Sequence, residues 1–322
     1  MAYSVEEKIA RISELKKKRG AIILSHFYTD SHVQSVADFV GDSLALAVEA
    51  KRSDAPVLLF AGVHFMAETA KVLSPEKVVL IPSLEAGCSL ADSCKAEDLE
   101  RFKRENPEHF VVAYVNTSVD VKCHTDICCT SSNALKVVES IDKDIPVLFL
   151  PDRNLGGYIK RMTGRENMTL WDGFCHVHEA FDTEVLAKLK GYHSDAEIVV
   201  HPECREEVAK MADYIGSTAG MIDYCLKSES KKFIVVTEQG ILSELQSKAP
   251  SKTFISLDIT SLEDCAIDTT SRRQRCAVCE YMKMITLDNI IEALENMTPE
   301  VTLSEETIEK ASTCINRMLE IK

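Results

Sequence analysis

The fold is decided by three short stretches at similar positions in a repeated pattern: residues 25–28 (SHFY), 113–116 (AYVN) and 200–203 (VHPE). Each belongs to the end of an apolar, largely β-branched run, which is typical of a parallel strand buried on both faces. The second residues of the three stretches lie 88 and then 87 positions apart: His26, Tyr114 and His201. This period predicts three copies of one structural unit.

Two further sets of residues follow the same pattern. Seventeen residues after each of these positions comes a hydroxyl residue that is expected to open a helix: Ser43, Ser131 and Thr218. Cys88 and Cys175 are again 87 residues apart, whereas Cys279 follows 104 residues later, so the third unit is expected to carry an insertion of about 17 residues near its end. A loose alternation of strands and helices would not keep independent offsets constant.

Apolar runs alternate with helix-like segments along most of the chain. The runs that predict strands are residues 21–24, 57–60, 78–81, 111–115, 147–150, 198–200 and 233–236. The segments that predict intervening helices include residues 42–51, 133–140 and 217–227. This alternation predicts an α/β fold: three homologous three-layer α/β/α domains with parallel sheets around a pseudo-threefold axis. The expected units are residues 1–105 with an N-terminal helix, 106–192 and 193–282, followed by a helical segment, 283–322, that packs back on the assembly.

Composition excludes several classes of protein. The chain has 322 residues, 45% of them hydrophobic and 27% charged, as in a globular protein of two or three domains. A net charge of −14 disfavours nucleic-acid binding. No apolar run is long enough for a transmembrane helix, and the charged N-terminus lacks the apolar core of a signal peptide. Neither G-x-G-x-x-G nor a P-loop motif occurs. We therefore expect a cytoplasmic protein with no nucleic-acid or membrane partner.

The repeated polar residues predict one central site. Ligands of parallel sheets bind beyond the carboxyl ends of the strands, so three units facing one axis would enclose a common cavity. Helix N-termini bind carboxylates and phosphates through free N–H groups and the helix dipole. Three of them around one cavity indicate a small polyanionic substrate. A single hydroxyl residue would be no more than a good helix cap, and it is the repeat that favours a functional role.

The cysteines predict a metal. Twelve cysteines in a reducing compartment are not a disulfide framework. Cys88, Cys175 and Cys279, one from each unit, would leave one coordination position open, as in catalytic zinc or in a [4Fe–4S] cluster with a free iron. All-thiolate ligation slightly favours iron–sulfur. Cys276 and Cys279 form C-A-V-C, which could be half a zinc site, a redox pair, or one ligand with a neighbour; we prefer the last, with Cys279 as the ligand. The remaining cysteines are interpreted as ordinary thiols: Cys94, Cys123, Cys128, Cys129, Cys204, Cys225, Cys265 and Cys314.

Pairs of polar residues at the strand ends suggest proton transfer. His201 and Glu203 are two residues apart, so on a continuing strand they would share a face as a base and an acid. The same spacing recurs in two further pairs: His26 with Tyr28, and Tyr114 with Asn116. His176 and His178 follow Cys175 and could support this ligand from behind, but neither is counted among the site residues.

At these residues the sequence resembles the quinolinate synthase family, the iron–sulfur enzymes of de novo NAD biosynthesis. The similar stretches span nearly the whole chain and include GDSLALA (41–47), EAGCSLADSC (85–94), LPDRNLGGYI (150–159), WDGFCHVHE (171–179), GSTAGM (216–221) and CEYMKMITL (279–287). The resemblance implies three α/β domains around a central [4Fe–4S] cluster with Cys88, Cys175 and Cys279 as ligands. One departure is Glu280, where many family members have proline. Another is Gln274 and Arg275, which precede the C-A-V-C motif where some relatives have a further cysteine. These departures leave a thiol-switch role for Cys276 doubtful.

The same resemblance implies the reaction and the site. The enzyme would condense iminoaspartate with dihydroxyacetone phosphate to quinolinate, phosphate and water, with the open iron as a Lewis acid and transient contact with the enzyme that supplies iminoaspartate. Proton transfer would fall to Glu203, Tyr114 and His201. The implied substrate contacts are His26, Tyr28, Ser43, Tyr114, Asn116, Ser131, His201, Glu203 and Thr218. The alternatives are a zinc-thiolate lyase or transferase acting on a small polyanion, and a non-catalytic iron–sulfur sensor, for which the sequence offers no DNA-binding motif.

Overall fold

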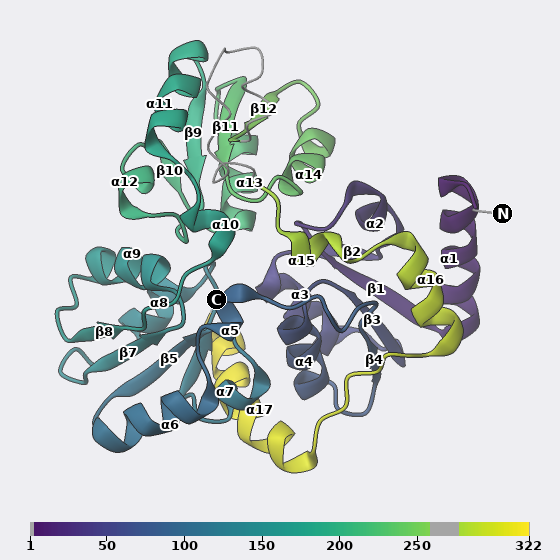
Figure 1. Ribbon diagram of the computed structural model, residues 1–322, viewed down its shortest axis with the longest axis horizontal. Helices are drawn as coiled ribbons and strands as arrows, with labels where there is room; N and C mark the ends of the chain where they lie inside the picture. Colours follow the sequence, from purple (N-terminus) through teal and green to yellow (C-terminus); the bar gives the residue numbers. More distant parts are fainter. Residues whose placement is uncertain (1–2, 258–276, 322) are drawn as a thin grey trace.

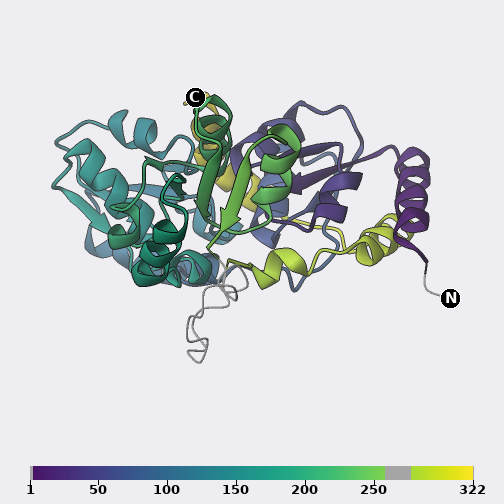
Figure 2. The same cartoon turned by 90° about the horizontal axis from the view of Figure 1, so that it is seen from above.

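Three lobes surround a common centre (Figure 1). The structure is a computed structural model that describes residues 3–257 and 277–321. We name the lobes by their sheets: the first holds β1 to β4, the second β5 to β8 and the third β9 to β12. The view from above shows a flat assembly with the lobes side by side (Figure 2).

The three sheets are entirely parallel and share one strand order, in which the first strand of the lobe lies between the second and third. The first sheet contains β1 (Ala21–His26), β2 (Phe39–Gly41), β3 (Val57–Ala61) and β4 (Val78–Leu80). The second contains β5 (Phe110–Tyr114), β6 (Ile127–Cys129), β7 (Val147–Leu150) and β8 (Met168–Leu170). The third contains β9 (Glu197–Val200), β10 (Tyr214–Ile215), β11 (Lys232–Val236) and β12 (Thr253–Ser256). The predicted α/β class with three parallel sheets is confirmed.

Helices connect the parallel strands and cover the sheets. Up to the end of the second sheet they are α1 (Val5–Arg19), α2 (Ser31–Val36), α3 (Ser43–Arg52), α4 (His64–Leu73), α5 (Ser89–Asp92), α6 (Ala96–Glu105), α7 (Val119–Lys122), α8 (Ala134–Glu139) and α9 (Arg153–Thr163). The later helices are α10 (His176–Glu179), α11 (Thr183–Tyr192), α12 (Glu206–Ala209), α13 (Thr218–Lys227), α14 (Ile241–Lys248), α15 (Glu280–Lys283), α16 (Leu287–Asn296) and α17 (Glu305–Glu320).

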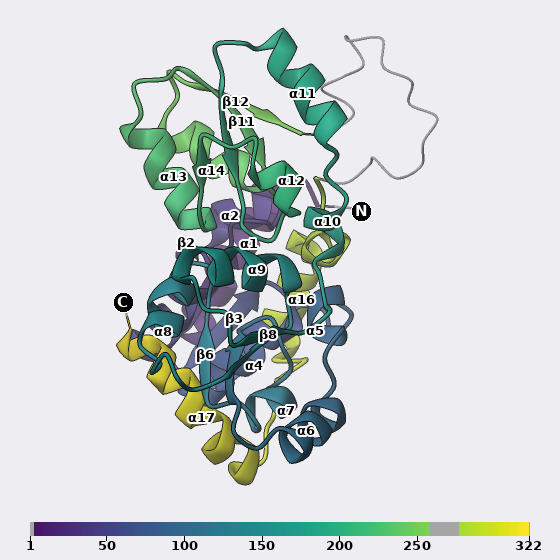
Figure 3. The same ribbon diagram turned by 90° about the vertical axis from the view of Figure 1, so that its left-hand side faces the viewer.

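The last two helices return to the first and second lobes. α16 packs along α1, and Ile290 and Leu294 join Ile12 and Leu15 in the apolar core on one face of the first sheet. α17 lies against β6, α4 and α7 (Figure 3). The C-terminal helices thereby complete cores that the first two lobes leave open, and α15, which comes before them, lies near the centre of the molecule (Figure 1).

The repeat extends to individual side chains. In each lobe an aspartate just before the second strand accepts a hydrogen bond from a backbone N–H 15 residues earlier, in the first strand. These aspartates are Asp38, Asp126 and Asp213, and their Oδ2 atoms lie 2.7, 2.8 and 2.7 Å from the donor nitrogens. Before the second strand begins, the N–H group of the first strand has no backbone partner on that side, and the carboxylate supplies one. The second strand therefore begins at the same register in all three lobes.

A buried cation is repeated in the same way. Lys77, Arg165 and Lys252 each donate to backbone carbonyls at the end of a helix 24 to 27 residues earlier. The helices are α3, α8 and α13, whose terminal carbonyls have no partners within the helix. A cation at this end also interacts favourably with the helix dipole. The N-terminal ends of α3, α8 and α13 face the centre of the molecule. The cations at the C-terminal ends therefore stabilise helices that contribute to the site.

Two sequence predictions need correction or lie outside the described residues. Ser131 does not open a helix: α8 begins at Ala134, and residues 131–133 form a turn in which Asn133 Oδ1 accepts from Thr130 N at 2.8 Å. Asn133 is the N-cap of α8, with a non-helical backbone at φ −128° and ψ 1°. Its side-chain amide also donates to the carbonyls of Met318 and Ile321 at the end of α17. The insertion predicted in the third unit falls largely on residues 258–276, outside the described residues, as do Cys265 and Cys276.

Candidate functional site

All twelve residues predicted for the site line one central cavity. It receives side chains from all three lobes: His26, Tyr28, Ser43, Cys88, Tyr114, Asn116, Ser131, Cys175, His201, Glu203, Thr218 and Cys279. His26 ends β1, Tyr114 ends β5, and His201 follows β9 directly. Each of these three is at most 5% exposed. The rule that parallel strands present their carboxyl ends to a ligand therefore places the repeated residues together.

The helix-start hydroxyls occupy the first helical position, not the cap. Asp42 is the N-cap of α3 and accepts from Ala45 N, and Ser217 is the N-cap of α13 and accepts from Gly220 N. Ser43 and Thr218 follow these caps, at the cavity wall. Because the preceding residue already serves as the cap, capping does not explain either hydroxyl.

Each predicted cysteine ligand is the N-cap of a four-residue helix: Cys88 of α5, Cys175 of α10 and Cys279 of α15. Burial raises the pKa of Cys88 to about 12 and that of Cys279 to about 11, although backbone N–H groups of α5 and α15 lower both in part. Burial likewise raises the pKa of Cys175 well above its usual value, and the negative charge of Glu203 adds to this effect. Thiolates at these positions would be stable only beside a cation.

Two buried acidic side chains accept hydrogen bonds from the backbones of two of these cysteines. Asp152 Oδ2 accepts from the backbone N–H of Cys175 at 3.3 Å, and Glu238 Oε1 accepts from that of Cys279 at the same distance. Asp152 and Glu238 are 0% and 1% exposed, and both follow the end of a strand, β7 and β11. Both side chains therefore hold the backbone of a cysteine loop, Glu238 from the cavity wall. Burial raises the pKa of both carboxyl groups, that of Asp152 well above its usual value.

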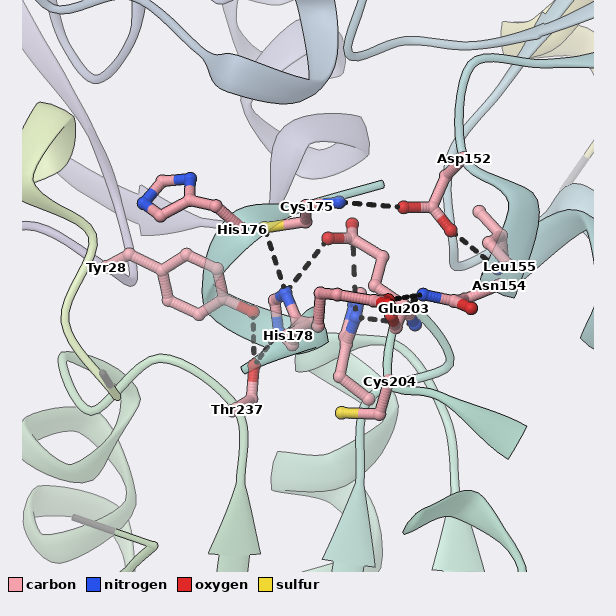
Figure 4. A network of polar contacts seen from close by, with 12 residues as sticks. Tyr28, Asp152, Asn154, Leu155, Cys175, His176, His178, Glu203, Cys204 and Thr237 are labelled. Carbon is pink, nitrogen blue, oxygen red and sulfur yellow. Dashed lines mark hydrogen bonds and ion pairs between the residues drawn. The ribbon is translucent and has the colours of Figure 1, made fainter. Parts of the chain in front are cut away.

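Glu203 is the centre of a buried polar network (Figure 4). Tyr114 donates its hydroxyl to Glu203 Oε1 at 2.5 Å, and His178 Nδ1 lies 3.0 Å from Oε2. His201, the partner expected from the sequence, is farther away, with Nδ1 at 3.9 Å from Oε1. Burial alone would raise the pKa of Glu203, but the interaction and hydrogen bond with His178, together with the hydrogen bond from Tyr114, lower it below its usual value. Glu203 is therefore a carboxylate at neutral pH.

His178 links this carboxylate to two other parts of the site. Its Nδ1 lies 3.2 Å from Cys175 Sγ, and its Nε2 lies 2.8 Å from Thr237 Oγ1. The hydroxyl of Tyr28 lies 2.7 Å from Thr237 Oγ1 and 3.0 Å from Thr218 Oγ1. A chain of hydrogen bonds thus runs from the wall formed by the first lobe to Glu203 in the third (Figure 4).

One buried acceptor remains available to a ligand. Asn116 Oδ1 has no hydrogen-bond partner within residues 3–257 and 277–321, and the residue lines the cavity. A buried polar atom without a partner is costly, so an N–H or O–H group of a bound molecule is its expected partner.

Comparison with known proteins decides the family. Residues 10–320 match the family described as Quinolinate synthetase A protein. The chain belongs to the quinolinate synthetase A family. A curated quinolinate synthase of Microcystis aeruginosa is 48% identical over 316 residues, 98% of this chain and 95% of the relative. That of Chloroherpeton thalassium is 48% identical over 310 residues, 96% of this chain and 93% of the relative. The resemblance inferred from the motifs is confirmed.

Membership of the quinolinate synthetase A family and the chemistry of the donors together fit a metal cluster. The three cysteines influence one another's pKa across the cavity. Within residues 3–257 and 277–321, one group of potential donors has its ligand atoms within 4.8 Å of one another, and it consists of Cys175, His178 and Glu203. The zinc alternative is not favoured, because the chain belongs to the quinolinate synthetase A family and is 48% identical to curated quinolinate synthases. Separately, no helix in the described part of this family member is both long and apolar enough to cross a membrane.

Sequence reasoning missed several residues of this family member's site. His178 was assigned no direct role, and Asp152 and Glu238 were not singled out. For His178 the available signal was its place three residues after a predicted ligand, on the same short helix. Its contacts with Glu203 and Thr237 join residues far apart in the chain, and no local pattern encodes them.

The buried histidines predict acid sensitivity. Burial lowers the pKa of His26 and His201 from 6.5 to about 3. In the unfolded chain both take up protons as the pH falls below 6.5, whereas the folded chain resists this, so stability is lost between about pH 6.5 and 3. The loss per histidine is at most about 1.4 kcal/mol per pH unit. We expect the difference in unfolding free energy between about pH 7 and pH 5 to be smaller in His201→Asn than in the parent.

The matched control is His32→Asn, because His32 lies on an exposed turn of α2. Denaturant unfolding at the two pH values, each variant compared with itself, measures the effect. An unchanged pH dependence in His201→Asn would contradict the prediction.

Proposed function

We propose that this chain is a quinolinate synthase that condenses iminoaspartate with dihydroxyacetone phosphate. One carbon–carbon and one carbon–nitrogen bond form, and quinolinate, phosphate and two molecules of water are released, so the reaction needs no external oxidant or reductant. The observation that carries the proposal is the meeting of twelve predicted side chains from three lobes at one cavity, in a chain of the quinolinate synthetase A family.

We propose a [4Fe–4S] cluster as the cofactor, held by Cys88, Cys175 and Cys279. Its support is the donor set: three thiols from three short helix starts, with no fourth cysteine at the cavity wall in the described part of the chain. When bound, such a cluster supplies a Lewis-acidic iron with an open coordination position. The carboxylates of Asp152 and Glu238 hold two of the cysteine backbones ready for it.

The anionic groups of the substrates would bind at the helix starts. α3 and α13 each have ten residues and point their first N–H groups and the hydroxyls of Ser43 and Thr218 toward the cavity. Ser131 contributes a hydroxyl from the turn before α8. These donors suit carboxylates and a phosphate. Asn116 offers its free Oδ1 to a donor on the substrate.

Proton transfer would depend on Glu203 and Tyr114. Glu203 is ionised at neutral pH because its pKa is lowered, so it can accept a proton, although as a weak base it does so only from an acidic group of the substrate. Burial raises the pKa of Tyr114 well above its usual value, so this hydroxyl stays protonated and can donate. His201 remains a neutral imidazole, because burial lowers its pKa to about 3, and can hydrogen-bond to a substrate without adding charge. Enclosure within the protein would protect the imine from hydrolysis.

The remaining expectations concern the surroundings of the enzyme. Iminoaspartate hydrolyses readily, so we propose transient contact with the enzyme that produces it. A reducing cytoplasm suits a protein whose twelve cysteines would remain thiols or metal ligands.

The test is anaerobic reconstitution followed by an assay for quinolinate with both substrates. The expected protein is brown, holds about four irons and four sulfides per chain, and forms quinolinate only when both substrates are present. Zinc-loaded protein is the control, and it should be colourless and inactive. Quinolinate formation by the zinc form, or none by the iron form, would reject the proposal.

A further inference from the structure

Glu238 is a buried acidic side chain with three polar partners. Its Oε1 accepts from the backbone N–H of Cys279 at 3.3 Å and lies 3.0 Å from Lys283 Nζ. Its Oε2 accepts from the backbone N–H of Gly240 at 2.6 Å. The side chain is 1% exposed, so the ion pair with Lys283 is shielded on the side of the carboxylate.

Lys283 carries the connection to the first lobe. It ends α15, four residues after Cys279, and its ammonium group donates to the backbone carbonyl of Tyr28 at 2.7 Å. Lys283 is not among the residues that line the cavity, so it acts from behind the wall. Tyr28 does line the cavity. Lys283 thus joins α15, which follows Cys279, to the loop of Tyr28 at the cavity wall.

The loop around Tyr28 is also held directly by the third lobe. Gln34 Nε2 lies within hydrogen-bond distance of three carbonyls, those of Phe27, Thr29 and Gly240. Gly240 leaves no room for a side chain, because a Cβ there would lie 2.8 Å from the Phe27 carbonyl oxygen. The backbones of the two loops are therefore in contact.

Cys175 provides the comparison within the same molecule. Asp152 holds its backbone N–H at 3.3 Å, as Glu238 holds that of Cys279, but the second oxygen of Asp152 accepts from Leu155 N in its own lobe. No ion pair with Asp152 is found within the described residues, and its hydrogen bonds do not reach the loop of Tyr28. Cys175 reaches the side chain of Tyr28 through His178 and Thr237. Among the described residues, a connection through a carboxylate from the backbone of a predicted cysteine ligand to the backbone of the Tyr28 loop is found only at Cys279.

We propose that Glu238 and Lys283 are positioning residues that couple the backbone of Cys279 to the loop of Tyr28. Through this ion pair, a displacement of the Cys279 backbone changes the position of the Tyr28 loop. A displacement of the Tyr28 loop likewise changes the position of Cys279. The roles of Cys279 as ligand and Tyr28 as substrate contact rest on the proposed function, whereas the coupling itself rests on the contacts above.

The test compares Lys283→Met with the parent as the cluster-loaded, full-length protein. Two readouts do not require turnover: hydrogen exchange of the peptide that contains Tyr28, and the rate of iron loss to a chelator. We expect faster exchange of that peptide and iron loss about tenfold faster, because supporting partners of metal ligands have effects of this size. In turnover, we expect KM for the substrates to rise more than kcat falls.

Three further variants complete the test. Glu238→Gln should behave like Lys283→Met in both readouts. Asp152→Asn should speed iron loss without changing exchange at Tyr28, and Lys248→Met, which removes a lysine from an ion pair on α14, should change neither. Unchanged exchange at Tyr28 in Lys283→Met, or the same change in Asp152→Asn, would overturn the coupling. A parent that forms no quinolinate would reject the proposed function and leave the exchange comparison intact, so the two failures are distinguishable.

Discussion

Replacing Cys88, Cys175 or Cys279 with alanine, one at a time, is expected to abolish both the metal cluster and quinolinate formation. Each cysteine comes from a different short helix at the centre of the molecule, and no other cysteine of the described residues lines the cavity to take its place. The remaining two thiols would have pKa values raised by burial and would stay protonated without the full charge of the cluster. Iron and sulfide analysis after anaerobic reconstitution, with the visible absorption of the cluster, measures the first effect, and the quinolinate assay measures the second.

The control variants are Cys94→Ala and Cys225→Ala. Both cysteines are buried, as ligands would be, but they belong to apolar cores and do not line the cavity. We expect both variants to bind iron like the parent and to lose at most about 2 kcal/mol of stability. If Cys94 or Cys276 proved essential for cluster assembly while Cys279 did not, the ligand assignment would be wrong.

The repeat made the fold and the site predictable together. A constant offset of 17 residues between a strand end and a hydroxyl residue indicates that the same connection recurs. Ser43 and Thr218 do open α3 and α13, whereas Ser131 lies in the turn before α8. Once the units are recognised, the rule for parallel strands brings their carboxyl ends to one place without any knowledge of contacts. This explains why all twelve predicted residues meet at the cavity although they come from three lobes.

The short edge strands were not predicted from the sequence. β2, β6 and β10 have two or three residues each, and β2 and β10 are only half-buried, so neither an apolar run nor an alternation marks them. Their positions are instead determined by the aspartates that precede them, Asp38, Asp126 and Asp213, which bond to the neighbouring strand. The turn at Ser131 was missed for a similar reason, since the side chain of Asn133 is committed to the distant helix α17.

The supporting residues of the site could not be read from sequence because their partners are remote in the chain. His178 meets Glu203 and Thr237, and Lys283 meets Tyr28, in each case across a boundary between lobes or segments. Glu203 itself was predicted, but with His201 as its partner, because two residues on one strand end suggested a pair. In the structure the chain turns after β9, and His178 takes the closer position.

Replacing Glu203 with glutamine is expected to lower kcat by about a hundredfold to ten-thousandfold, the range for loss of a general acid or base. The substitution keeps the size of the side chain and an oxygen to accept from Tyr114, but it removes the negative charge that His178 stabilises. Glu203 is 4% exposed, so water cannot easily replace the carboxylate as a proton acceptor. Steady-state kinetics with both substrates, on protein with measured iron content, tests this.

The control variant is Glu207→Gln, four residues further along the chain. Glu207 pairs with Arg205 on the surface, and its carboxylate is 54% exposed, so its loss should leave kcat and KM unchanged. A fall in kcat without loss of iron and with little change in KM would show that Glu203 acts on the reacting groups, because an interaction used only in the transition state lowers kcat and kcat/KM equally. Full activity in Glu203→Gln would instead restrict the carboxylate to holding His178 and Tyr114 in place, and proton transfer would then have to pass through Tyr114 or the neutral imidazole of His201.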